Sequence, residues 1–205
     1  ALARRVVELA VPARPAALKD GLSSGADVLV ADFDDMLSPT WDNLVGAQRA
    51  LKARWSAEGL AAHPPGASPA VMVRPRGLHL EDERISAGGR AVAACLLDAG
   101  LYLFHNAGAI VAAGGIPALY LSKLESRREA AFWEALLGDI ENRLGLEPGS
   151  VKVTVSIETL PAAFEMDEIL HALRWRILGL QSGRSSFLFS FIKRLRGHKR
   201  FLSPD

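Results

Sequence analysis

The sequence has little cysteine, no excess of charge of either sign and no long apolar run. Its single cysteine, Cys95, cannot close an internal disulfide or build a zinc site alone, which favours a reducing compartment, most simply the cytoplasm. With 24 basic and 23 acidic residues the net charge is +1, which argues against nucleic acid as the main partner. No uninterrupted apolar run approaches the roughly 18 residues that span a bilayer, so we expect no membrane partner.

What is present is the composition of a folded domain, since 49% of the residues are hydrophobic and 23% are charged. The 205 residues can bury a sizeable core, and we predict one domain over residues 1–205. This length is short of the roughly 250 residues that are typical of a (β/α)8 barrel.

Short apolar runs alternate with stretches of helical period, and this pattern predicts a parallel α/β fold. The clearest strand is 151–157, where Val and Ile alternate with Lys, Thr and Ser. The candidate strands are 26–33, 70–73, 118–121, 151–157, 177–180 and 187–191. The candidate helices cover about 91–113, 126–144 and 159–174, the last two beginning with Ser126 and Thr159 as possible caps.

Charged side chains follow several of these strands, at the edge where ligands collect in parallel α/β folds. They are Asp32, Asp34, Asp35, Arg74, Arg76, Lys123, Glu125 and Glu158. Carboxylates suit Mg²⁺, and guanidinium or ammonium groups suit an anion, so the set indicates chemistry on an oxyanion held at a metal. The alternative is that these residues only solvate the rim. Glu158, directly before a helix cap, and Arg76, followed by the flexible Gly77, are the strongest candidates.

Five segments together resemble the malate synthase family in its shorter bacterial and glyoxysomal form. They are ADFDDMLSPTW (31–41), RPRGLHL (74–80), GLYLFHN (100–106), YLSKLES (120–126) and IETLPAAFEMDEIL (157–170). The segments follow the family's order and spacing and cover almost the whole chain.

The resemblance implies a TIM barrel that condenses acetyl-CoA with glyoxylate to give malate and CoA, a step of the glyoxylate cycle, with Mg²⁺ as cofactor. By resemblance, Arg76 is the catalytic arginine that stabilises developing oxyanion charge, and Glu158 is a metal-binding carboxylate. The residues expected to bind substrate are Asp34, Asp35, Trp41 and Lys123.

The segment 179–190 departs from the family pattern. It reads GLQSGRSSFLFS, where the family has approximately GLNxGRWDYIFS, so Ser186 stands at the position of the second metal-binding aspartate. Replacing an anion by a hydroxyl removes several kcal/mol of attraction to a dication, and we therefore expect a weakened Mg²⁺ site.

The family carries its general base in a C-terminal helical domain beyond the region that this chain resembles. Six strands cannot close an eight-stranded barrel, so we expect an incomplete TIM barrel that lacks the base. Self-association or a missing partner segment would then cover its edges. Two alternatives stay open: a non-catalytic barrel remnant that binds CoA or a partner chain, and a citrate or citramalyl-CoA lyase, whose barrel, arginine and paired acids are similar.

Overall fold

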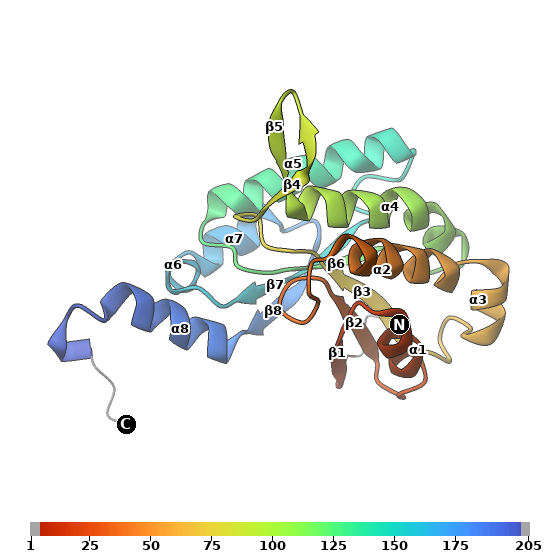
Figure 1. Cartoon of the computed structure of the whole chain (residues 1–205), viewed down its shortest axis with the longest axis horizontal. Helices are drawn as coiled ribbons and strands as arrows, with labels where there is room; N and C mark the ends of the chain where they lie inside the picture. Colours follow the sequence, from red (N-terminus) through yellow and green to blue (C-terminus); the bar gives the residue numbers. More distant parts are fainter. Residues whose placement is uncertain (1–4, 202–205) are drawn as a thin grey trace.

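The computed structural model describes residues 5–201 and contains a six-stranded parallel sheet that curls into part of a barrel (Figure 1). In the order in which they lie side by side, its strands are β1 (Glu8–Pro12), β2 (Val28–Asp32), β3 (Ala70–Arg74), β6 (Ala118–Leu121), β7 (Lys152–Ile157) and β8 (Ile177–Ser182). Spatial neighbours are thus consecutive strands of the sheet along the chain, as in the wall of an α/β barrel. The predicted incomplete TIM-type barrel is confirmed for the described residues.

Helices follow the strands, and all but the last join successive strands and cover the outer face of the sheet (Figure 1). They are α1 (Pro15–Leu22), α2 (Trp41–Arg54), α3 (Ala57–Ala62), α4 (Ala94–Ala112), α5 (Arg127–Leu144), α6 (Leu160–Phe164), α7 (Met166–Ala172), α8 (Arg184–Leu195) and a 3-10 turn (Lys199–Phe201). A hairpin of β4 (Glu81–Ala87) and β5 (Arg90–Ala93) stands apart from the sheet, between β3 and α4.

The strands β2, β3 and β6 are apolar on both faces, which is why they appear as continuous apolar runs in the sequence. In β2, Leu29 and Ala31 pack into the main core beneath the helices. Val28 and Val30 alternate with them and join a smaller cluster with Met72 on the other face. Every residue of β2 is buried, so the strand is held from both sides.

One predicted strand is wrong, and three strands were missed, namely β1 of the six-stranded sheet and both strands of the β4–β5 hairpin. The run 187–191 lies within α8, none of whose side chains is buried; a short apolar run has no period that separates helix from strand. The missed strand of the six-stranded sheet is β1, a five-residue segment that ends in a proline. Helix α8 points away from the sheet and exposes Leu188, Phe189 and Ile192 (Figure 1).

Helix α4 is long and apolar enough to cross a membrane by length and composition, with a mean hydropathy of 1.3. Half of it is buried, and Cys95, Tyr102 and Ile110 contribute to the main core. Within the described fold it is therefore a core helix, and its polar residues Asp98 and Asn106 are buried with it.

The predicted helix ends are confirmed in part. Gly145 ends α5 in the left-handed conformation, and the Thr159 hydroxyl accepts a hydrogen bond from the Ala162 N–H at the start of α6. Ser126 precedes α5 but its side chain makes no cap hydrogen bond. The helix predicted over 159–174 is broken at Glu165, whose backbone leaves the helical region.

Candidate active site

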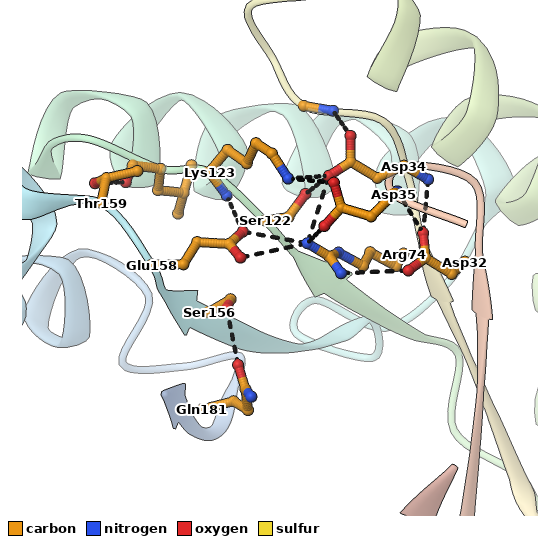
Figure 2. Close-up of polar contacts among 12 residues, drawn as sticks. Asp32, Asp34, Asp35, Arg74, Ser122, Lys123, Ser156, Glu158, Thr159 and Gln181 are labelled. Atoms are coloured by element: carbon orange, nitrogen blue, oxygen red, sulfur yellow. Dashed lines mark hydrogen bonds and ion pairs between the residues drawn. The ribbon is translucent and has the colours of Figure 1, made fainter. Parts of the chain in front are cut away.

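The carboxyl ends of the parallel strands bring a group of charged side chains together (Figure 2). Asp32 ends β2 and is the register partner of Arg74, which ends β3. Glu158 follows β7, and Lys123 follows β6. We call Asp32, Asp34, Asp35, Arg74, Lys123 and Glu158 the strand-end cluster.

Arg74 lies at the centre of this cluster. Its Nη1 is 3.2 Å from Asp32 Oδ2, and its Nη2 is 2.8 Å from Asp35 Oδ2 and 3.3 Å from Glu158 Oε1. The guanidinium carbon also lies 5.8 Å from the centre of the Tyr120 ring, within the range of a cation–π contact. The Arg74 guanidinium therefore joins the carboxylates that follow β2 to the carboxylate that follows β7.

Lys123 holds the other side of the cluster. Its Nζ donates to Asp34 Oδ2 and Asp35 Oδ1, both at 2.8 Å, and its backbone N–H donates to Glu158 Oε1 at 2.7 Å. Its φ of +56° is the only positive value at a described residue other than glycine. Such a conformation is unfavourable for a side chain with a Cβ and persists where surrounding contacts fix it, often at a functional site.

The loops after β2, β3 and β6 are tied to one another by carboxylates. Asp32 Oδ1 accepts the N–H groups of Asp34 and Asp35, an Asx turn that fixes the loop. Asp34 Oδ1 accepts the Gly77 N–H at 3.1 Å, and its Oδ2 accepts the Ser122 hydroxyl at 3.1 Å. These bonds preorganise the cluster.

The electrostatics keep both cations charged. Burial alone would lower the pKa of Arg74 and of Lys123, but the neighbouring carboxylates outweigh it and raise both. Burial raises the pKa of Asp32 despite Arg74, whereas hydrogen bonds from Lys123 and the charge of Arg74 outweigh burial at Asp35 and lower its pKa. Four carboxylates face two cations, so the cluster carries a formal excess of negative charge.

A cavity of about 400 Å³ adjoins the cluster, a size that suits a small ligand. Arg74, Asp35 and Glu158 form one wall, and the residues from Gln181 to Ser186 form another. A Cβ at Gly183 would lie 2.5 Å from the Cβ of Glu158, so only glycine permits this close approach. Burial raises the pKa of the Tyr120 phenol in the same wall to about 12, which leaves it a neutral hydrogen-bond donor.

The structure brings most of the predicted site residues together. Asp34, Asp35, Lys123 and Glu158 lie in the cluster, and Ser186 lines the adjoining cavity. Two others lie elsewhere. Trp41 begins α2, is about half exposed and contacts Arg84, whose guanidinium carbon is 5.7 Å from its ring centre.

Arg76 is directed into the scaffold. Its side chain is bound to Asp98 of α4 through Nε and Nη2, both at 2.8 Å, and to Asp82 of β4 through Nη1 at 2.9 Å. Strand β3 ends at Arg74, so the turn that follows, and no longer the alternation of the strand, directs Arg76. Arg74 is the arginine that faces Glu158, and a catalytic role for Arg76 stays a prediction.

Sequence reasoning missed the inward-facing residues that precede the strand ends. Tyr120 and Ser156 each lie two positions before a residue that contacts the cluster, and the Ser156 hydroxyl donates to Gln181 Oε1 at 2.8 Å. The signal was the alternation of the strands, because residues two positions apart share a face.

The oxygen atoms that could bind a cation at the cavity include the carboxylates of Glu8, Asp35 and Glu158 and the hydroxyls of Ser156 and Ser186. Within residues 5–201 no three His, Cys, Asp or Glu side chains are grouped so as to hold a metal ion. Glu158 and Asp35 both contact Arg74 and border the cavity, and Glu158 is the more deeply buried of the two.

Comparison with known proteins identifies the family. The family model described as "Malate synthase, TIM barrel domain" matches residues 70–205. The malate synthase from Myxococcus xanthus is 43% identical over 98% of this chain, and the glyoxysomal malate synthase from Zea mays is 41% identical over 100% of it. Malate synthase A from Escherichia coli is 39% identical over 98% of this chain. The chain spans 38 to 39% of the length of these three relatives.

A solved structure agrees with the fold. A crystal structure of a citrate lyase from Burkholderia xenovorans matches 89% of this chain and 49% of that protein's chain, with a TM-score of 0.63 and 17% identity. At that identity the likeness concerns the architecture alone. The family model and the similar sequences point to the same family, and the curved parallel sheet agrees with them. The chain belongs to the malate synthase family.

Proposed function

We propose that the strand-end cluster binds glyoxylate and takes part in its condensation with acetyl-CoA to malate and CoA. The observation that carries the proposal is Arg74, a half-buried guanidinium that borders the 400 Å³ cavity beside Glu158. The chain that places it there is about 40% identical to malate synthases over nearly its whole length.

Arg74 is suited to hold the carboxylate of glyoxylate, because a planar guanidinium can bind both carboxylate oxygens at once. When the enolate carbon of acetyl-CoA attacks the aldehyde carbon, the carbonyl electron pair moves to oxygen, which becomes the hydroxyl of malyl-CoA after protonation. Water then cleaves the carbon–sulfur bond of this thioester and releases malate and CoA. A cation fixed beside the aldehyde oxygen stabilises its developing charge. The bonds of Arg74 to Asp32 and Asp35 hold it in place beforehand.

The described carboxylates are poorly suited to remove the methyl proton of acetyl-CoA. The pKa of Asp35 is lowered by Lys123 and Arg74 against the effect of burial, which makes it a weak base. The pKa of Asp32 is raised by burial, but its oxygens accept from two backbone N–H groups and from Arg74. A base outside the cluster agrees with the resemblance, which assigns this role to a C-terminal domain of the family.

The cavity suits Mg²⁺ by donor type and by charge, since its donors are oxygens and the cluster has an excess of carboxylates. Glu158 would hold the ion, with the Ser186 hydroxyl as a neutral donor. When bound, Mg²⁺ would polarise the aldehyde of glyoxylate. We expect Ser186→Asp to tighten Mg²⁺ binding by about tenfold or more, measured by isothermal titration calorimetry. Unchanged affinity would contradict this role of Ser186.

Glyoxylate binding to the 205-residue chain, titrated with and without Mg²⁺, tests the proposal directly. We expect Arg74→Met to weaken binding by about tenfold or more, because the carboxylate loses a charged, hydrogen-bonded partner. Arg143→Met is the matched control, since that exposed arginine pairs only with Asp139 on the surface of α5. Equal glyoxylate affinity of wild type and Arg74→Met would refute the proposal.

A thiol-release assay distinguishes this function from the two alternatives. Release of CoA from acetyl-CoA that depends on glyoxylate supports condensation, whereas cleavage of malyl-CoA or citramalyl-CoA without it supports a lyase. Only the fold is shared with the citrate lyase, while the sequence favours malate synthase. Binding of CoA without either reaction would support a non-catalytic barrel segment. The cytoplasm stays the proposed location.

A further inference from the structure

A second cavity lies at the opposite ends of the strands, beneath the helices. It measures about 340 Å³ and is walled by α1, α2 and α3 and by the sheet. Its apolar wall includes Leu18 and Leu22 of α1, Leu51 of α2, and Leu29 and Val71, each the second residue of its strand. Helix α2 begins beyond the end of β2 and runs back along the sheet, so its last residues lie near the strand beginnings. None of the strand-end cluster borders this cavity.

Arg54, the last residue of α2, forms part of the wall and has no carboxylate partner within residues 5–201. It is 6% exposed, and its Nε has no hydrogen-bond acceptor. Its other nitrogens make weak contacts, with Nη2 3.2 Å from Ser68 Oγ and Nη1 3.5 Å from the Gly59 carbonyl. The guanidinium carbon lies 4.5 Å from the Trp55 ring centre.

The other buried arginines of the described fold differ from Arg54 in that each has a carboxylate partner. Arg76 is bound to Asp98 and Asp82, and Arg176 is bound to Glu141. A buried charge without a counter-charge is strongly unfavourable, and burial accordingly lowers the pKa of Arg54.

No acidic side chain borders the cavity to supply the missing charge. Lys19 and His63 lie in the same wall and add basic character. The carboxyl end of α2 offsets the charge of Arg54 only in part, since a helix terminus is equivalent to about half an elementary charge. The cavity therefore combines an apolar interior with an unneutralised guanidinium.

We propose that this cavity binds a small amphipathic carboxylate, whose head pairs with Arg54 and whose alkyl chain packs against Leu18, Leu22 and Leu51. The planar guanidinium, with a free Nε–H, matches the two oxygens of a carboxylate. A single buried cation neutralises a monoanion, which favours a carboxylate over a doubly charged phosphate. The site is separate from the strand-end cluster and does not rest on the proposed enzyme activity.

Octanoate is the probe, with octan-1-ol as a ligand of equal chain length without charge and acetate as a charge without a chain. We expect octanoate to bind and to shift the ¹H–¹⁵N signal of the Arg54 Nε–H group, and the two controls to bind at least about tenfold more weakly. Arg54→Met should weaken octanoate by about tenfold or more. Ala50→Leu, which fills the cavity from α2 without altering Arg54, should do the same.

Thermal unfolding supplies an independent readout. Arg54→Met should keep or raise the melting temperature, because it removes an unpaired buried charge. The matched Arg176→Met should lower the melting temperature, because the buried Glu141 loses its guanidinium partner. The inference is overturned if octanoate does not bind, if octan-1-ol binds equally well, or if Ala50→Leu binds octanoate like the wild type. A melting temperature lowered as much by Arg54→Met as by Arg176→Met would also overturn it. Ala50→Leu keeps the test valid if Arg54→Met does not fold.

Discussion

Substituting lysine for each arginine of the RPRG segment separates a scaffold role from a ligand-binding role. Arg76→Lys keeps the buried positive charge but removes the planar fork that holds Asp98 at 2.8 Å through two nitrogens, while a third nitrogen holds Asp82 at 2.9 Å. A single ammonium group cannot reproduce all three bonds. Both carboxylates are almost fully buried, so water cannot replace the lost donors.

The magnitude follows from the number of bonds lost. If two of the three charged hydrogen bonds of Arg76 are lost, at about 1.5 kcal/mol each, the free energy of unfolding falls by about 3 kcal/mol. With an m-value of about 2 kcal/mol/M, the urea midpoint should fall by about 1.5 M. Arg74→Lys should lower the free energy of unfolding by only about 1 kcal/mol, because Arg74 borders a cavity where water can replace lost bonds.

The assay is urea unfolding of both variants, followed by titration with glyoxylate in the presence of Mg²⁺. We expect Arg76→Lys to lose stability but to keep its glyoxylate affinity while folded. We expect Arg74→Lys to lose little stability but to bind glyoxylate more weakly. The reasoning is refuted if Arg76→Lys unfolds like the wild type and binds glyoxylate more weakly. Arg76 would then be the substrate-binding arginine that the family resemblance implies.

Three further substitutions test the scaffold around these sites. Burial would raise the pKa of Glu141, but hydrogen bonds from Arg176 outweigh it and lower the pKa, so this carboxylate stabilises the fold above about pH 4.5 and loses its effect as the pH falls. Glu141→Gln should therefore destabilise by about 3 kcal/mol at pH 7 and by less at pH 4 in urea unfolding; an equal loss at both would contradict the ion pair. Gly183→Ala should displace Glu158, and glyoxylate or Mg²⁺ titration should show weakened binding; unchanged affinity would show that the loop adjusts. Thr159→Ala should lower the free energy of unfolding by about 1 kcal/mol through loss of the α6 cap, while Thr159→Ser should keep most of it.

The sheet was largely predictable because β2, β3 and β6 are mostly buried and form continuous apolar runs, while β7 shows a clear alternation of apolar and polar residues. The run 187–191 has the same composition but forms part of the exposed helix α8, and local sequence does not distinguish the two outcomes. Strand β1 was not predicted because its five residues carry a charge at one end and a proline at the other. What identifies it is its pairing with β2, a contact that a local pattern does not encode.

The strand-end rule placed Asp34, Asp35, Lys123 and Glu158 near one another, because all carboxyl ends of a parallel sheet meet at one edge. The same rule could not show which of Arg74 and Arg76 faces the cavity. The direction of a side chain beyond a strand end depends on the turn and on distant partners such as Asp98, which lies on a helix further along the chain.

The neutralisation of buried charge distinguishes the roles of four arginines. Arg76 and Arg176 are matched by carboxylates within the fold, and such pairs fix geometry without a need for a ligand. Arg74 is also paired, but its partners outnumber the cations around it and it borders a cavity, so a bound cation and an anionic substrate can both be accommodated there. Arg54 has no matching carboxylate within residues 5–201, and the proposed bound carboxylate would neutralise it. Since an unpaired buried charge costs several kcal/mol, the balance of charge around each arginine separates scaffold from binding site where sequence motifs alone do not.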